Sequence, residues 1–275
     1  MSNRIEKTFN SLEKKQSKAF IPYTVLGFPN RDASLEAIET LIANGATALE
    51  LGLPFSDPMA DGPLIENASK QVVESGFTTS NAINLISEIR SRHADIPIVL
   101  MSYFNLALAR GFETFMREIK EAGVDGLTFV DLPPEEGAEV FNLAKKHGIA
   151  PVMLVSPLTS EQRFDEILKH AEGYLYLVSR AGITGLAETY DTKLESIITK
   201  LRAKSNLPVV IGFGISKPAH VQSMLKLGAD GVVVGSKIVE LIRDDNKDKL
   251  AAIVSELSAA SKQIFDSEIF ELVRR

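Results

Sequence analysis

The sequence contains no cysteine, which excludes disulfides, zinc thiolate sites and cysteine nucleophiles. Its four histidines are His93, His147, His170 and His220, and none of them has the HxH or HxxxH spacing of a histidine metal site. We therefore expect no bound metal.

Long apolar runs and excess positive charge are also missing. No run approaches the ~20 apolar residues that a transmembrane helix needs. Residues 1–20 lack the unbroken apolar stretch of about 7–15 residues that marks a secretory signal peptide. Lys and Arg number 30 against 36 Asp and Glu, whereas a nucleic-acid partner requires a basic face. We expect a cytoplasmic protein without a membrane or nucleic-acid partner, although backbone N–H groups could hold a phosphorylated metabolite.

One pattern recurs along the chain: an amphipathic helix, a Gly or Asn break, and a short run rich in Val, Ile and Leu. Gly123 and Gly228 each stand just before such a run, and glycine past a helix end accepts the left-handed conformation that closes the last turn. Apolar runs bounded in this way are typical of parallel strands buried on both faces. Eight runs occur, at residues 19–25, 47–51, 97–101, 125–130, 150–155, 174–178, 208–212 and 230–234.

Helical patterns separate these runs, at residues 31–44, 111–122, 135–147, 160–170, 192–204 and 217–227. Eight strands that alternate with helices predict an α/β fold, a closed (β/α)8 TIM barrel, as a single domain over residues 1–275. We expect an extra helix before the first strand and extra helices after the second and the eighth. An open doubly wound sheet is the alternative.

The run at 47–51 contains the first candidate for chemistry. Side chains alternate along a strand, so Glu50 shares a face with Ala48, while Leu49 and Leu51 share the other. If the leucines meet the helices, Glu50 points into the barrel mouth, where the active sites of such barrels lie. A buried carboxylate is costly unless it is paired or used, so a structural ion pair is the alternative.

The segment after this run adds two carboxylates, Asp57 and Asp61, near the mouth. Asp-Pro and Asp-Gly are turn pairs, and Pro63 suits the first position of a helix. Spacing alone therefore favours a role in the turn for both aspartates.

The run at 174–178 carries Tyr174 and Tyr176 on one face, where they could serve the core or the site. The polar stretch that follows is long enough to form a lid. Further on, Gly212 and Gly214 follow one run, and Gly235 precedes a helix after the next. Glycine loops and a helix N-terminus at the ends of the last two strands are the usual phosphate site of a barrel. The third glycine of a dinucleotide fingerprint is missing.

Together these residues resemble the tryptophan synthase alpha subunit family. The resemblance rests on ELGLPFSDPMADGP at 50–63, LVSRAGITG at 177–185, GFGIS at 212–216 and Gly235 with Ser236, in matching order along the chain. It implies retro-aldol cleavage of indole-3-glycerol phosphate to indole and glyceraldehyde 3-phosphate. It also implies an α2β2 complex with a beta subunit, which receives the indole and uses pyridoxal phosphate. The alpha subunit itself is expected to need no cofactor.

The resemblance also implies roles for individual residues. Glu50 and Asp61 are the expected catalytic carboxylates, with Tyr176 near the reacting carbon. The expected phosphate contacts are Gly185, Gly214, Gly235 and Ser236. The expected indole pocket contains Tyr23, Ile65, Leu100 and Phe213, and family members often have Phe in place of Tyr23.

Two further segments take expected roles from the resemblance. Segment 180–192, with Arg180 and Thr184, is the expected lid, and Thr184 would meet Asp61 on closure. Pro54 and Asp57 resemble the surface that meets the beta subunit.

Three alternatives remain open. A sugar-phosphate isomerase would share the two glycine loops but not the 50–63 motif. A catalytically weak activator of a beta subunit would not need Glu50 and Asp61. A stand-alone lyase without a partner is the third alternative, because contacts with a partner are not visible in one chain.

Overall fold

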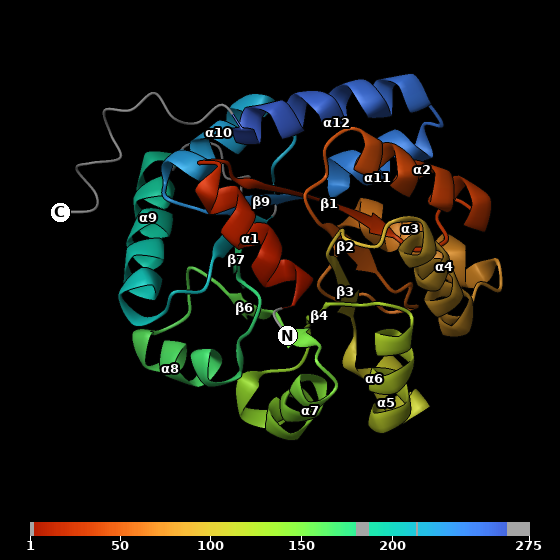
Figure 1. Cartoon of the computed structure of the whole chain (residues 1–275), viewed down its shortest axis with the longest axis horizontal. Coiled ribbons are helices and arrows are strands. Elements are labelled where there is room, and N and C mark those ends of the chain that lie inside the picture. Colours follow the sequence, from red (N-terminus) through yellow and green to blue (C-terminus); the bar gives the residue numbers. More distant parts are fainter. Residues whose placement is uncertain (1–2, 180–186, 213, 263–275) are drawn as a thin grey trace.

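A computed structural model describes residues 3–179, 187–212 and 214–262, and parallel strands alternate with helices throughout these ranges (Figure 1). The strands are β1 (Ala19–Val25), β2 (Leu49–Gly52), β3 (Ile98–Ser102), β4 (Gly126–Phe129), β5 (Ala150–Pro151), β6 (Met153–Val155), β7 (Leu175–Val178), β8 (Val209–Gly212) and β9 (Gly231–Val234). Their order in the sheet is β5-β4-β3-β2-β1-β9-β8-β7-β6. Since β5 and β6 follow each other directly in the chain, the sheet closes on itself, and the predicted TIM barrel is confirmed.

The fifth predicted strand, residues 150–155, differs from expectation because it is split in two. The N–H groups of Ala150 and Val152 both donate toward β4, to Asp125 O and Leu127 O at 2.9 Å each. The nitrogen between them belongs to Pro151, which has no hydrogen to donate toward β7. Pairing with β7 therefore begins only at Met153.

Twelve helices lie within the described ranges and surround the strands (Figure 1). They are α1 (Arg4–Lys14), α2 (Arg31–Ala43), α3 (Pro63–Glu74), α4 (Thr79–Arg92), α5 (Phe104–Arg110), α6 (Phe112–Glu121), α7 (Pro134–Lys146), α8 (Glu161–His170), α9 (Ala187–Lys204), α10 (Pro218–Lys226), α11 (Ser236–Arg243) and α12 (Lys247–Lys262). The expected extra helices are α1, then α3 and α4 after β2, and α11 and α12 after β9. Helix α5 was not predicted, because it is short and buries only Ala107.

Helix α1 lies across the amino end of the barrel, in front of the strands in Figure 1. A methyl group on Gly126 would approach Ile5 Cδ1 to 2.8 Å, so this glycine leaves room for Ile5 at the floor of the barrel. Phe9, one turn later, contacts the ring of Tyr174 at a centroid distance of 5.9 Å. The helix therefore closes this end with apolar side chains.

A buried aspartate fastens α1 and α4 to the strands at the same end. Asp125, which directly precedes β4, accepts from Arg4 and Arg90 at 2.8 Å each and from Ile98 N–H at 3.0 Å. Arg90 Nη2 also donates to Gly123 O at 2.9 Å. All these groups have partners, as buried charges require.

A second aspartate repeats this arrangement before β9. Asp230 accepts from Lys18, Arg202 and Val209 N–H at 2.9–3.0 Å. Arg202 Nη2 also donates to Gly228 O at 2.7 Å. The repeat follows the sequence, because both aspartates stand in a Gly-Xaa-Asp-Gly segment. Aspartate and arginine thus fix the amino ends of two strand pairs, β3 with β4 and β8 with β9.

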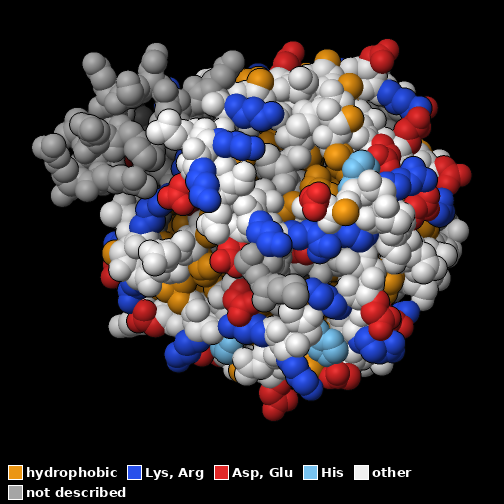
Figure 2. Space-filling model, viewed as in Figure 1, with side chains coloured by type: hydrophobic (Ala, Val, Ile, Leu, Met, Phe, Trp, Pro, Cys, Tyr) orange, Lys and Arg blue, Asp and Glu red, His pale blue; other side chains and the backbone are white. Residues whose placement is uncertain are grey.

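The outer surface carries both signs of charge. Figure 2 shows Lys and Arg side chains interspersed with Asp and Glu over the face that it displays. Within the described ranges, no helix combines the length and the apolar character needed to cross a membrane.

Candidate active site

The inner face of the barrel brings Glu50 together with two tyrosines. Glu50 lies beside Tyr23 of β1 and Val99 of β3 in the register of the sheet, so the three side chains share a face. Tyr176 lies on β7, which is not adjacent to β2, and still interacts electrostatically with Glu50. The two side chains are therefore both directed into the interior, and Glu50 points inward as the alternation predicted.

Glu50 is a buried carboxyl group without a compensating charge. Only 1% of the residue is exposed, and its Oε1 has no hydrogen-bond partner among the described residues. Burial, and secondarily the nearby Asp61, raises the pKa of Glu50 to about 8. The structural ion pair considered as the alternative is therefore not found in the described part of the chain, and Glu50 is set to hold a proton at neutral pH.

The loop between β2 and α3 brings Asp61 to the same mouth. Ser69 of α3 holds the loop, since it accepts from Phe55 N–H at 2.7 Å and donates to Phe55 O at 2.8 Å. Asp61 closes a turn through its N–H, which donates to Pro58 O at 3.1 Å. The turn role expected from spacing is therefore present, and the side chain remains available for a second one.

Asp61 has a different electrostatic setting from Glu50. Burial raises its pKa to about 6, a hydrogen bond from Tyr103 opposes that shift, and Glu66 adds to it. Asp61 is therefore mostly ionised at neutral pH, while Glu50 is mostly protonated.

Tyr103 was missed by the sequence reasoning. Its hydroxyl donates to Asp61 Oδ2 and accepts from Ala60 N–H, both at 3.1 Å. It follows β3 directly, so position at the carboxyl end of a strand was the available signal. Residue type did not distinguish it from a core tyrosine.

Two glycines make space for the tyrosines that line the interior. A methyl group on Gly52 would lie 2.3 Å from the hydroxyl oxygen of Tyr23, and one on Gly212 would lie 2.0 Å from that of Tyr176. Burial, followed by nearby acidic groups, raises the pKa of both tyrosines well above the usual value. Both phenols therefore stay neutral and can serve as hydrogen-bond donors.

The expected indole pocket is assembled in part. A methyl group on Gly235 would lie 3.2 Å from Tyr23 Cδ1 and 3.6 Å from Ile65 Cδ1, which brings these residues together. The expectation that Leu100 lines this pocket is wrong. Leu100 pairs with Leu51 in the register and therefore lies on the helix-facing side of β3, opposite to Glu50. Its neighbour Met101 is on the inner face.

The expected phosphate contacts lie near the ends of β8 and β9. Gly214 is exposed with a φ of +72°, a conformation that suits glycine. Gly235 is the N-cap of α11, and exposed Ser236 is its first residue. The carbonyl of Gly235 accepts from Ile238 N–H and Val239 N–H at 2.8 and 3.1 Å. The first N–H groups of α11 have no acceptor within the helix and suit an anion.

Four expected site residues, Arg180, Thr184, Gly185 and Phe213, lie outside the described residues. Most of the expected lid, segment 180–192, also lies outside the described residues. Of the expected partner contacts, Asp57 is exposed and accepts from Ser56 Oγ, whereas Pro54 is buried. Pro54 therefore shapes the loop rather than its outer surface.

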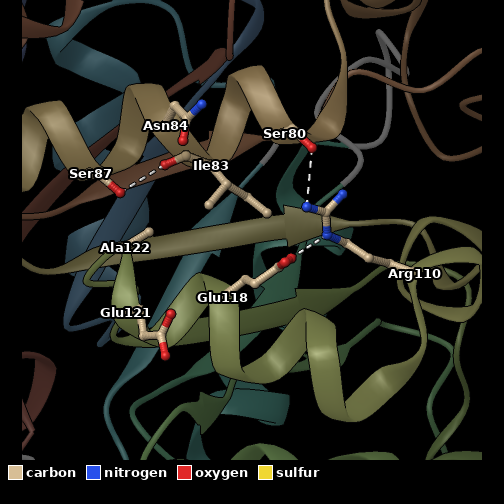
Figure 3. A pocket seen from close by; sticks show the side chains of 8 residues that line it. All are labelled: Ser80, Ile83, Asn84, Ser87, Arg110, Glu118, Glu121 and Ala122. Atoms are coloured by element: carbon tan, nitrogen blue, oxygen red, sulfur yellow. Dashed lines mark hydrogen bonds and ion pairs between the residues drawn. The ribbon is translucent and has the colours of Figure 1, made fainter.

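Two further observations bear on other kinds of site. A cavity of about 260 Å³ lies between α4 and α6, outside the barrel (Figure 3). Arg110, which lines it, is already bonded to Glu118 and Ser80, so the cavity offers no unpaired cation to a ligand. Within the described ranges, no group of three or more His, Asp or Glu is placed to hold a metal ion.

Comparison with known proteins gives a consistent result. The model of the family described as "Tryptophan synthase alpha chain" matches residues 9–267. A tryptophan synthase alpha chain of Francisella tularensis subsp. tularensis is 42% identical over 267 residues, which cover 95% of this chain and 99% of the relative. One of Methanoregula boonei is 41% identical over 269 residues, with 96% and 100% covered.

Solved structures agree. The crystal structure of tryptophan synthase subunit alpha from Legionella pneumophila matches with a TM-score of 0.88 at 34% identity. The match covers 96% of this chain and 100% of that one.

Proposed function

Because the chain belongs to the tryptophan synthase alpha chain family, lyases of tryptophan biosynthesis, we propose that it cleaves indole-3-glycerol phosphate to indole and glyceraldehyde 3-phosphate. One observation carries this proposal. A buried Glu50 that favours its protonated form faces an Asp61 that favours its ionised form, at the mouth of a barrel. A retro-aldol cleavage at indole C3 needs this pair of states.

Glu50 begins the proposed reaction as an acid. It donates its proton to C3 of the indole ring, which becomes an indolenine, an electron sink. The resulting carboxylate then takes the proton of the substrate hydroxyl on the adjacent carbon. As the carbonyl forms, the electrons of the C–C bond pass into the indolenine and regenerate indole. A positioned acid–base group of this kind contributes about 10²–10⁴-fold to the rate.

Asp61 stabilises the charge that develops in this scheme. The indolenine nitrogen is positive, and its N–H can donate to the ionised carboxylate. The two carboxyl groups thus have separate roles that follow from their surroundings. Tyr176, whose hydroxyl lies against Gly212, is the proposed contact of the reacting carbon.

The phosphate of the substrate would sit at α11. Backbone N–H groups of Gly235 and Ser236 and the partial positive charge of the helix N-terminus supply its contacts. Gly214 lies at the end of the neighbouring strand. No basic side chain is required, which suits the acidic composition of the chain.

We also propose a beta subunit as the partner, in an α2β2 complex that receives the indole. The large hydrophobic residues exposed in the described ranges are Met59, Leu108 and Leu158. They follow β2, β3 and β6 in the chain, so all three lie on the rim formed by the carboxyl ends of the strands, the same end of the barrel as the site of Glu50. Apolar side chains on the rim of a reaction site support docking of a subunit that accepts an apolar product.

Indole release from indole-3-glycerol phosphate tests this function. We expect the wild-type chain to release indole and the beta subunit to increase the rate. Glu50→Gln keeps the shape of the side chain and removes the titrating proton, so turnover should fall about 10²–10⁴-fold while substrate binding persists. Binding is measured by calorimetry on the same preparation.

Each alternative gives another result. A wild-type chain inactive with and without the beta subunit would rule out the lyase and favour the weak activator. Full activity without any response to the beta subunit would favour the stand-alone lyase.

A further inference from the structure

Tyr103 connects the loop of Asp61 to the end of β3. Its hydroxyl stands between the Asp61 carboxylate and the backbone of Ala60, with 3.1 Å to each. Its ring stacks on Phe55 of the same loop, with a centroid distance of 4.9 Å and an interplanar angle of 26°. One buried side chain therefore contacts the loop near its beginning and at its end.

Tyr103 itself is fixed in the fold. It follows the last residue of β3 and is the N-cap residue of α5. Asp131, at the end of β4, accepts from Phe104 N–H at 2.8 Å and so holds the start of α5. Asp61, by contrast, lies in a segment without regular secondary structure. Tyr103, which is fixed at the end of β3, thus holds the Asp61 carboxylate in place, although the segment around Asp61 has no regular secondary structure.

The other groups that face Asp61 provide no such support. Glu66 approaches from α3, and its charge opposes ionisation of Asp61. Glu50 on β2, Tyr23 on β1 and Tyr176 on β7 interact with Asp61 electrostatically, and none of these interactions is a hydrogen bond to its carboxylate. Among the described residues, the Tyr103 hydroxyl is the only hydrogen-bond donor to the Asp61 carboxylate.

We propose that Tyr103 is a positioning residue, which orients the Asp61 carboxylate toward the substrate and keeps it in its ionised form. This inference rests on the proposed lyase activity. Asp61 acts on the substrate, and Tyr103 acts through Asp61. A hydrogen bond to a charged group favours the charged form, so its loss raises the pKa of the acceptor.

The variant Tyr103→Phe removes the hydroxyl and keeps the ring that stacks on Phe55. We expect kcat to fall about 10-fold, the size of one lost hydrogen bond to a charged group, with a smaller change in KM. The acid limb of the kcat/KM profile, where Asp61 takes up a proton, should move to higher pH. A residue that served only packing would leave this limb in place.

Tyr174→Phe is the matched control. It also removes a buried tyrosine hydroxyl, but one that has no hydrogen-bond partner among the described residues. Its acid limb should stay at the wild-type position. If Tyr103→Phe does not fold, Phe55→Leu loosens the stacking and leaves the hydroxyl, and a smaller shift in the same direction is expected.

The titration of the Asp61 carboxyl carbon, followed by NMR in wild type and Tyr103→Phe, separates this inference from the proposed function. A higher pKa of Asp61 in the variant supports the inference even if the chain releases no indole. An unchanged Asp61 titration and an unchanged acid limb would overturn it, whatever the activity of the wild type.

Discussion

Acidic side chains lie at both ends of the barrel, and their surroundings are opposite. At the amino ends of the strands, Asp125 and Asp230 each contact two basic side chains and a backbone N–H. At the carboxyl ends, Glu50 and Asp61 have no basic partner within the described residues, and burial raises the pKa of both.

The difference shows how one fold separates stability from chemistry. A fully paired carboxylate is unavailable for chemistry, because its charge and its hydrogen-bond acceptors are already satisfied. An unpaired one destabilises the folded state when it ionises and can still give or take a proton. Barrels generally place function at the carboxyl ends of the strands and stability at the amino ends. Variants at the amino ends should therefore lose stability, whereas variants at the carboxyl ends should lose activity.

The largest effect on stability should come from Asp125→Ala. The substitution leaves Arg90, whose side chain is only 12% exposed, without its carboxylate, and it removes the acceptor of Ile98 N–H. Breaking a buried pair by removing one partner costs about 3–5 kcal/mol. We expect the free energy of unfolding, measured in urea, to fall by that amount, while kcat per folded molecule stays near the wild-type value.

Asp32→Ala is the control for this variant. Asp32 pairs with Arg31 on the surface, and its side chain is 89% exposed, so its loss should change the free energy of unfolding by less than about 0.5 kcal/mol. Equal losses in the two variants, or a fall in kcat for Asp125→Ala, would contradict the separation of the two ends.

The second effect concerns the pH dependence of stability at Glu50. The pKa of Glu50 is about 8 in the folded chain, against 4.5 for an unperturbed glutamate. Below pH 4.5 the group is protonated in both states, so its contribution to stability is at its most favourable. As pH rises toward 8 the unfolded chain ionises first, and stability is lost across that window. At about 1.36 kcal/mol for each pH unit between these two values, the loss should be on the order of 4 kcal/mol by pH 8.

Glu50→Gln lacks this titration, so its urea midpoint should fall less between pH 5 and pH 8 than that of the wild type. At pH 8 the variant should be the more stable protein, although it is the less active one. Parallel pH curves for the two proteins would show that Glu50 has a normal pKa, and the acid role proposed for it would lose its basis.

Much of this arrangement could be predicted from the sequence. The barrel follows from the period of eight apolar runs and glycine breaks, because buried parallel strands have few other sequence patterns. Glu50 follows from alternation, since Leu49 and Leu51 share the face expected to meet the helices and Glu50 lies on the other. Asp61 is different, because its own spacing favoured a turn, and only the longer motif around it predicted a catalytic role.

The remainder depends on contacts between distant segments, which a single sequence does not display. Leu100 and Met101 are both apolar, and only the register of β3 shows which one faces the interior. Tyr103 gained a role because the loop before α3 folds back onto it. The aspartates at the amino ends were hidden because their arginines lie 28 or more residues away in the chain.

The smallest effect on the free energy of unfolding should come from Arg202→Met, which compares the ion pair of Asp230 with that of Asp125. Arg202 and Arg90 have matching contacts, because each donates to an aspartate and to the glycine carbonyl two residues before it. They differ in burial, since the Arg202 side chain is 48% exposed and that of Arg90 is 12% exposed.

Solvent screens an exposed pair, and Lys18 still neutralises Asp230, so we expect Arg202→Met to cost about 0–1 kcal/mol in urea unfolding. Arg90→Met should cost several times more. In 1 M salt the loss in Arg202→Met should shrink further, while that in Arg90→Met should persist, because a buried pair is screened much less. Similar losses in the two variants would show that geometry, rather than burial, sets the strength of these pairs.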